Sequence, residues 1–352
     1  MKLSFLMGPM MGIILLLAST NCSVVQTKNQ ASITLPFPPL PPLSPSLVRL
    51  NEKKYEQVPE IKDLCGKIDS SFARYKWGKS DCLDYPWKSF RKSLKGTALG
   101  WMVFQNFPEK EKGEFLTPEE QREVNITLII CGVHGDEITP VKFCLDVAKM
   151  LKEEGIPKHG PSFEKHHPKH GELLTQIIVV PIANPDSFFI SKPSRTNARG
   201  IDINRNFPTK DWRANALKVW KNRYKSDPRK YPGKSSLSEP ETIFQVNLIK
   251  LYSPDKIISV HAPLTLIDYD GPTLTSSCAP SELLKNMSAK SSLLKIMNYP
   301  FFPGSIGNWA GNERKIPTYT LELPSSSPEK HQYFWELFKE VIQLAIESPL
   351  KL

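Results

Sequence analysis

The stretch NITLIICGVHGDEITPVKFCLDVAKMLKEEG, residues 125–155, indicates the fold class. It opens with an apolar run typical of a buried strand and continues into a segment whose apolar residues recur at helical spacing. Gly155 is the expected end of that helix, and one helix face carries Val141, Cys144, Leu145, Ala148 and Leu151. A strand followed directly by such a helix is the repeating unit of α/β domains.

Working outward, four further apolar runs predict strands at residues 97–107, 176–185, 255–263 and 316–324. Amphipathic segments between and after them predict helices at residues 238–252 and 328–348. The strand runs are apolar throughout, which is typical of strands buried on both faces. We therefore expect an α/β fold with a mixed, mostly parallel central sheet and helices on both faces.

The helix predicted at residues 238–252 has a strong start signal. Ser238 is the expected N-cap, Pro240 lies in the first turn, and Glu241 completes a capping box with Ser238.

The N-terminal residues have the composition of an export signal. Residues 1–22 contain one Lys, a short apolar core and small polar residues, as in a secretory signal peptide. Cys22 also resembles the lipidated Cys of a bacterial lipoprotein, although Asn21 departs from the small residue usual there; the alternative is an ordinary signal peptide. We expect an exported protein of a bacterium, either periplasmic or anchored to the membrane through a lipid on Cys22.

The rest of the chain divides by composition. Residues 23–50 are expected to form a Pro-rich linker, residues 51–90 an N-terminal extension, and residues 91–350 the main folded domain. The net charge of +10 favours anionic partners such as acidic polymers. The basic residues are scattered, without zinc-finger spacing or an RNA-binding aromatic signature, so no nucleic-acid partner is expected. The sequence does not indicate an oligomeric state.

The cysteines and a histidine-rich loop have simple interpretations. Cys65 and Cys82 flank a polar loop and can form a disulfide in an oxidising compartment, whereas Cys131 and Cys144 look like buried free thiols. No CxxC pair appears, which disfavours a cysteine-based zinc site. Residues 157–172 hold four histidines, and a solvated loop is the expected structure there.

Polar side chains follow several of the predicted strands. His134 and Glu137 follow the strand of the opening stretch, and His261 and Glu322 end two later strands. Because ligands bind at the carboxyl ends of strands in open α/β sheets, we expect these four residues at one edge. Two His and one Glu are a familiar zinc ligand set, with a second carboxylate free to move protons. Each residue alone is ambiguous, since HxxE quartets arise often by chance and a buried His is more often structural.

The most specific segment is SRTNARGIDINRNFP, residues 194–208. Arg195, Arg199 and Arg205 lie close together in the chain among Asn side chains. Arginine offers a planar set of donors suited to carboxylates; the alternative is a basic loop that binds anions nonspecifically.

These pieces together resemble the M14 family of zinc carboxypeptidases. That family has HxxE, then a motif ending D-x-N-R-N-F or D-x-N-R-N-W, then a strand-ending His and a Glu on a late strand. All four occur here in the same order, over roughly residues 90–346.

The resemblance implies one zinc ion held by His134, Glu137 and His261. It also implies that Asn204 and Arg205 bind the substrate's terminal α-carboxylate, that Arg195 polarises the scissile carbonyl, and that Glu322 is the general base. Asp202 would hold the loop and can support His134, whereas Asp136 only forms the turn between the ligands.

Details of the segments HAPLTLIDYDGP (261–272) and PGSIGNWAGNERKIPTYTLELP (303–324) are similar to the murein-peptide amidase branch. Those enzymes cut the γ-D-glutamyl–diaminopimelate amide of peptidoglycan peptides, which implies such a peptide as substrate. Arg199 and Asp270 would recognise its zwitterionic side chain. The Ser-Tyr that follows the third ligand in many members is absent, and the substrate-facing Tyr of the digestive enzymes has no counterpart.

Three alternatives remain open from the sequence. A carboxypeptidase of ordinary peptides, or of another stem-peptide bond, would use the same metal centre. A zinc deacylase of N-acyl amino acids shares a similar first motif. A non-catalytic wall-binding lipoprotein is disfavoured by the complete ligand set and the intact Glu322.

Overall fold

The computed structural model describes residues 59–107, 116–156, 174–274 and 279–350. The expected signal segment, the Pro-rich linker and the histidine-rich loop lie outside these ranges. Within the described residues, no helix combines the length and the apolar character needed to cross a membrane.

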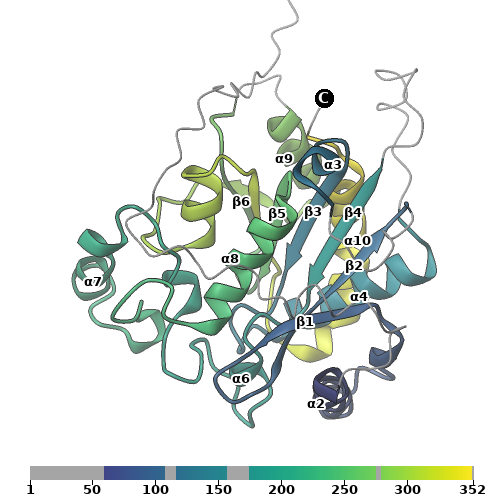
Figure 1. The fold of residues 1–352 in the computed structure, drawn as a ribbon, viewed down its shortest axis with the longest axis horizontal. Helices are drawn as coiled ribbons and strands as arrows, with labels where there is room; N and C mark the ends of the chain where they lie inside the picture. Colours follow the sequence, from purple (N-terminus) through teal and green to yellow (C-terminus); the bar gives the residue numbers. More distant parts are fainter. Residues whose placement is uncertain (1–58, 108–115, 157–173, 275–278, 351–352) are drawn as a thin grey trace, which may run out of the picture.

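The centre of the molecule is an eight-stranded sheet with the order β1-β2-β4-β3-β5-β8-β6-β7 (Figure 1). The pairs β3–β4, β3–β5, β5–β8 and β6–β7 are parallel; β1–β2, β2–β4 and β6–β8 are antiparallel. The strands are β1 Trp87–Lys92, β2 Ala98–Gln105, β3 Asn125–Ile130, β4 Thr175–Val180, β5 Lys256–His261, β6 Leu266–Asp270, β7 Lys295–Met297 and β8 Thr318–Glu322. The predicted mixed, mostly parallel sheet is confirmed.

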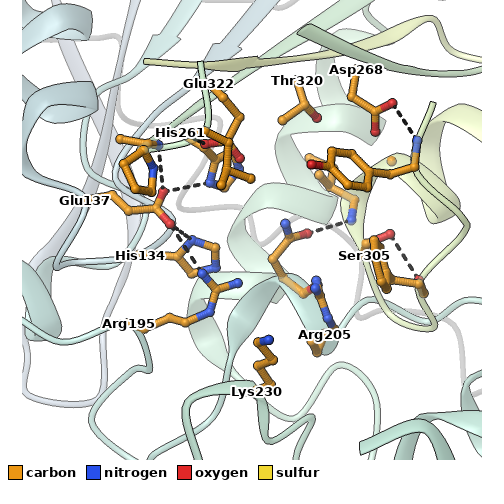
Figure 2. Close-up of a pocket in the computed structure, with 18 of the residues that line it drawn as sticks. His134, Glu137, Arg195, Arg205, Lys230, His261, Asp268, Ser305, Thr320 and Glu322 are labelled. Atoms are coloured by element: carbon orange, nitrogen blue, oxygen red, sulfur yellow. Dashed lines mark hydrogen bonds and ion pairs between the residues drawn. The ribbon is translucent and has the colours of Figure 1, made fainter. Parts of the chain in front are cut away.

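Parallel pairing brings the carboxyl ends of β3, β5 and β8 to one edge of the sheet, where the side chains in Figure 2 lie. His261 and Glu322 are paired in register as the last residues of β5 and β8. The chain leaving β3 reaches the same edge through the HGDE turn before α4 begins.

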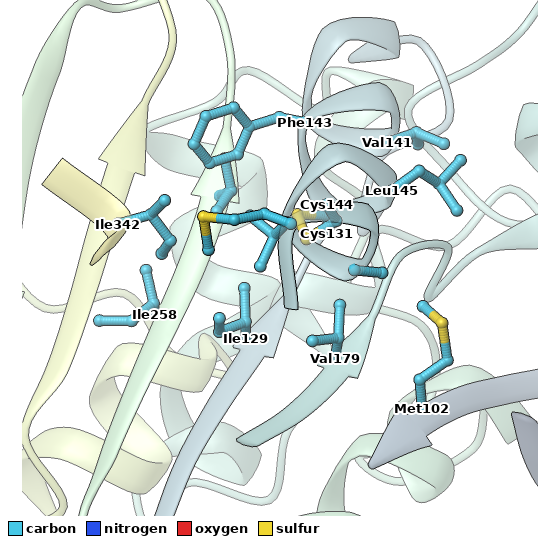
Figure 3. Close-up of a cluster of buried hydrophobic side chains, with 14 of the residues drawn as sticks. Met102, Ile129, Cys131, Val141, Phe143, Cys144, Leu145, Val179, Ile258 and Ile342 are labelled. Atoms are coloured by element: carbon cyan, nitrogen blue, oxygen red, sulfur yellow. A yellow bond between two sulfur atoms is a disulfide. The ribbon is translucent and has the colours of Figure 1, made fainter. Parts of the chain in front are cut away.

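Helices cover both faces of the sheet, as expected. The longer helices are α2 Pro59–Tyr75, α4 Ile138–Glu153, α7 Trp212–Asn222, α8 Pro240–Tyr252, α9 Ala279–Lys290 and α10 His331–Glu347. Ile129, Val179 and Ile258 point into a core shared with α2, α4, α9 and α10 (Figure 3), whereas Leu128 and Ile178 join a second core with α8. Burial on both faces explains why these strands are apolar throughout.

The N-terminal described residues belong to the same core. The apolar face of α2, including Ile61, Leu64 and Ile68, packs with the helices on one face of the sheet, and β1 pairs with β2. This part of the expected extension, residues 59–90, therefore packs on the same fold as the main domain.

The cysteine prediction is half right. Cys65 and Cys82 form the disulfide that the sequence had left open. Cys131 and Cys144, expected to be free thiols, form a second disulfide with Cα atoms 6.2 Å apart (Figure 3). The free-thiol prediction is wrong because Cys131, directly after β3, and Cys144, on α4, are buried in the same core, where their sulfurs meet.

The predicted capping box of α8 is also wrong. The N-cap is Glu239, whose side chain makes no capping bond, and the helix begins at Pro240. Ser238 Oγ donates to Glu239, and Glu241 accepts from Asn197 Nδ2 at 3.0 Å. The start signal placed the helix correctly, but its polar side chains bind a neighbouring loop instead of the helix end.

Close packing holds the HGDE turn in place. A Cβ built on Gly135 would lie 2.4 Å from the carbonyl carbon of Ser187, in α6 Pro185–Phe188. No side chain fits at that distance, so position 135 requires Gly for the turn to place His134 and Glu137 at the sheet edge.

We predict that Gly135→Ala lowers the free energy of unfolding by about 1–3 kcal/mol, because backbone must move to admit the methyl group. Chemical denaturation measures this loss. The matched control is Gly66→Ala in α2, where a Cβ meets nothing within 4 Å; it should be neutral or slightly stabilising. Equal stability of Gly135→Ala and the wild type would contradict the packing argument.

Candidate metal centre and substrate pocket

Three potential ligand side chains meet at the sheet edge. Glu137 lies between two imidazoles, with Oε1 2.7 Å from His134 Nδ1 and Oε2 2.9 Å from His261 Nδ1 (Figure 2). All three residues are buried, and their ligand atoms lie within 4.8 Å of one another. Two imidazoles and one carboxylate fit zinc and leave a coordination position for water or substrate.

The remaining ring nitrogens of the histidines have partners of their own. His134 Nε2 lies 3.2 Å from Asp202 Oδ1, and His261 Nε2 lies 3.0 Å from Ser259 Oγ. Such contacts fix the orientation of each ring and leave Nδ1 facing the shared point. The donor set and its supporting contacts therefore fit a zinc ion.

The electrostatics keep the ligand carboxylate ionised. Burial alone would raise the pKa of Glu137, but the two histidines beside it hold that pKa below its usual value. Asp202 is fully buried as well, and Arg195 and His134 hold its pKa below the usual range. An ionised carboxylate is the form that binds a metal.

Arg195 connects the loop of residues 194–208 to this centre. Its Nε donates to Asp202 Oδ2 at 3.0 Å, and its Nη1 donates to Glu137 Oε1 at 3.3 Å. Asp202 thus binds Arg195 and His134 at the same time. It therefore holds the loop and supports His134, as the sequence suggested. The guanidinium lies beside the ligands, where it can donate to a substrate carbonyl oxygen.

Glu322 is the second carboxylate of the pocket. Burial raises its pKa to about 7, with an added contribution from Glu137, while His261 opposes the shift. Its Oε2 accepts a hydrogen bond from the backbone N–H of Leu264 at 3.4 Å. A carboxyl that titrates near neutral pH can both take and return a proton.

Asn204 and Arg205 lie farther along the same cavity, which has a volume of about 550 Å³. Asn204 is fixed because its backbone N–H donates to Asp202 and its side-chain oxygen accepts from Ile306 N at 2.9 Å. The Arg205 guanidinium lies 4.7 Å from the ring centre of Phe302 and lines the cavity. Together they offer neutral and charged donors to a carboxylate.

Asp270, at the end of β6, also lines the cavity. Asn312 Nδ2 donates to it at 2.7 Å, and burial raises its pKa to about 6. Gly307 and Gly311 leave it room, because a Cβ on either would collide with it. The structure thus brings the predicted anionic residue to the pocket.

Arg199 is not brought there. Its Nη1 donates to the carbonyl of Ser238 at 3.3 Å and lies 3.6 Å from Glu239 Oε1, and it is not among the residues that line the cavity. Both carboxylates of Glu239 and Glu241 accept hydrogen bonds from Asn197 Nδ2. These contacts of Arg199 and Asn197 with residues 238–241 hold the loop of residues 194–208 against the start of α8.

Sequence reasoning missed several residues that line the cavity: Arg223, Tyr224, Arg229, Lys230, Asp268 and Phe302. Most lie in irregular segments between the motifs. Asp268 was within the quoted HAPLTLIDYDGP segment, and its alternation with Asp270 along a strand places both on one side.

Fold and site together define a zinc-dependent hydrolase. The family model for zinc carboxypeptidases, peptidase M14, matches residues 88–345, which is most of the chain. The chain belongs to the M14 family of zinc metallopeptidases, and its zinc site is the group His134, Glu137 and His261.

Two proteins of similar sequence and one of similar structure are the relevant comparisons. Murein peptide amidase A of Vibrio campbellii is 29% identical over 211 residues, covering 58% of this chain and 73% of that protein. Murein peptide amidase A of Escherichia coli K12 is 28% identical over 244 residues, covering 68% and 82%. Carboxypeptidase A of Helicoverpa armigera shares the fold, with a TM-score of 0.54, 15% identity and coverage of 82% and 80%.

The buried Glu241 gives a pH-dependent stability. Burial raises its pKa from 4.5 to about 7 in the folded protein, so between these values only the unfolded chain releases the proton. The contribution of the protonated Glu241 to the free energy of unfolding is therefore fully present below pH 4.5 and is lost as the pH rises to 7. We predict that the wild type loses about 2 kcal/mol relative to Glu241→Gln between pH 5 and pH 8.

Urea unfolding at the two pH values measures this difference. Gln at position 241 keeps an oxygen that accepts from Asn197 but carries no titrating group. Glu153→Gln, at an exposed position, is the control and should follow the wild type. A parallel pH dependence of Glu241→Gln and wild type would show that the carboxyl is not held protonated.

Proposed function

We propose that the protein hydrolyses peptidoglycan stem peptides at the γ-D-glutamyl–diaminopimelate amide bond. The observation that carries this is the charge distribution of one cavity. Asn204 and Arg205 suit the α-carboxylate of the released residue, and Asp270 suits an ammonium group on its side chain. The similarity to two proteins named murein peptide amidase A supports the same substrate.

In this reaction, each residue of the site has a separate role. Zinc held by His134, Glu137 and His261 would polarise the scissile carbonyl and acidify a water molecule. Glu322 is placed to take a proton from the water that attacks the carbonyl carbon and to deliver it to the amine released when the C–N bond breaks, as its pKa of about 7 allows. Arg195 donates to the oxygen on which negative charge develops, and Asp202 holds its guanidinium in position. Asn204 and Arg205 hold the substrate's free carboxylate.

A second candidate is a carboxypeptidase that removes basic residues from ordinary peptides. It is favoured by the same Asp270, since a lysine side chain also ends in an ammonium group. The two functions differ in the acyl side of the scissile bond and in the second carboxylate of diaminopimelate.

Export is part of the proposal. The N-terminal sequence supports it, and so do the Cys65–Cys82 and Cys131–Cys144 disulfides, because disulfides persist in oxidising compartments. A lipid on Cys22 would keep the enzyme near the cell wall at the membrane surface.

The test is incubation of the zinc-loaded enzyme with L-Ala-γ-D-Glu-diaminopimelate, with products followed by mass spectrometry. We expect free diaminopimelate and L-Ala-D-Glu. Release of C-terminal lysine from an ordinary peptide, with the tripeptide left intact, would overturn the amidase proposal in favour of the carboxypeptidase.

Glu322→Gln should lower kcat by about 10²–10⁴-fold with zinc content unchanged, because the amide cannot accept the proton. Glu336→Gln, an exposed glutamate on α10, is the matched control and should keep full activity. Full turnover by Glu322→Gln would show that another group is the base.

A further inference from the structure

One wall of the cavity carries three cations over two aromatic rings. The guanidinium of Arg205 lies 4.7 Å from the ring centre of Phe302 and 6.0 Å from that of Tyr224. Arg223 lies 4.9 Å and 5.8 Å from the same two rings, and Lys230 Nζ lies 4.4 Å from Tyr224. All five residues line the cavity, and we call the three basic ones the cationic cluster.

Within the described parts of the chain, no carboxylate lies at ion-pair distance from Arg205, Arg223 or Lys230. Arg195 and Arg229, which line the same cavity, do form such ion pairs. Aromatic faces attract cations but do not neutralise them. Three like charges on one wall of a concave site create a positive potential that an anion would relieve.

The segment that carries Arg223 and Lys230 is held in place. It connects α7 to the short helix η5, Pro228–Lys230. Trp220 Nε1 donates to the carbonyl of Asp227 at 2.8 Å, and the Trp220 and Tyr231 rings pack with centres 4.9 Å apart. The backbone that carries the two cations is therefore held in place, and both side chains line the same cavity as Asn204 and Arg205, although they lie outside the motif of residues 194–208.

We propose that Arg223 and Lys230 bind a second carboxylate of the substrate, in addition to the one held by Asn204 and Arg205. This inference rests on the proposed function. A γ-D-glutamyl–diaminopimelate peptide has two further carboxylates: one at the far end of the diaminopimelate side chain and one on the α-carbon of D-Glu. Either is a suitable partner for a guanidinium and an ammonium group on the same wall.

The test compares steady-state kinetics of Arg223→Gln/Lys230→Gln with the wild type on L-Ala-γ-D-Glu-diaminopimelate. We expect KM to rise roughly tenfold with kcat nearly unchanged, because the lost contact is made equally in the ground state and the transition state. Lys218→Gln/Lys221→Gln is the matched control. It removes two charges from exposed positions of α7 that do not line the cavity, and should leave KM unchanged.

Two substrate analogues identify which carboxylate is bound. Lysine in place of diaminopimelate removes the side-chain carboxylate, and D-isoglutamine in place of D-Glu removes the α-carboxylate. The KM ratio between variant and wild type should fall to about one for the analogue that lacks the bound group. An equal KM rise for all three substrates would overturn the inference, since it would reflect general electrostatic attraction.

The failures are distinguishable. No cleavage of the tripeptide by the wild type overturns the proposed function and, with it, this inference. Cleavage by the wild type with the same KM in Arg223→Gln/Lys230→Gln overturns the inference alone.

Discussion

The structure of the site depends on one buried carboxylate. Glu137 contacts His134 from the turn after β3 and His261 at the end of β5, so two segments far apart in the chain meet at its two oxygens. Removing a charged group from water is costly unless partners surround it, and here two imidazoles, Arg195 and a backbone N–H do so. A zinc ion held by these three residues would complete the compensation.

The second organising element is the loop of residues 194–208, which Asp202 attaches to the centre. One buried carboxylate holds Arg195, His134 and the backbone of Asn204. The group suited to a developing oxyanion and the groups suited to a substrate carboxylate are therefore placed relative to the metal ligands by a single residue. Under the proposed function, substrate binding and chemistry would depend on the same residue, which would fix the distance between the terminal carboxylate and the scissile bond.

The sequence predicted the parts with strong periodicity or distinctive motifs. The five expected strands became β2, β3, β4, β5 and β8, and the strand-end residues His134, His261 and Glu322 converge as the parallel-sheet argument requires. The short or polar strands β1, β6 and β7 carry little periodic signal and were missed. Yet β6 is the strand that carries Asp270 to the pocket.

Contacts between elements were the harder part to predict. The Cys131–Cys144 disulfide depends on which face α4 turns to β3, and Glu241 serves the loop of Asn197 rather than its own helix. The rings beneath Arg205 come from two irregular segments with no local signature.

X-ray absorption at the zinc edge, on protein loaded with one equivalent of zinc, tests most directly whether His134, Glu137 and His261 bind the metal. Binding by these residues predicts two imidazole nitrogens and a carboxylate oxygen at about 2.0–2.2 Å, with one imidazole lost in His261→Ala. A sulfur ligand, or an unchanged spectrum in His261→Ala, would contradict it.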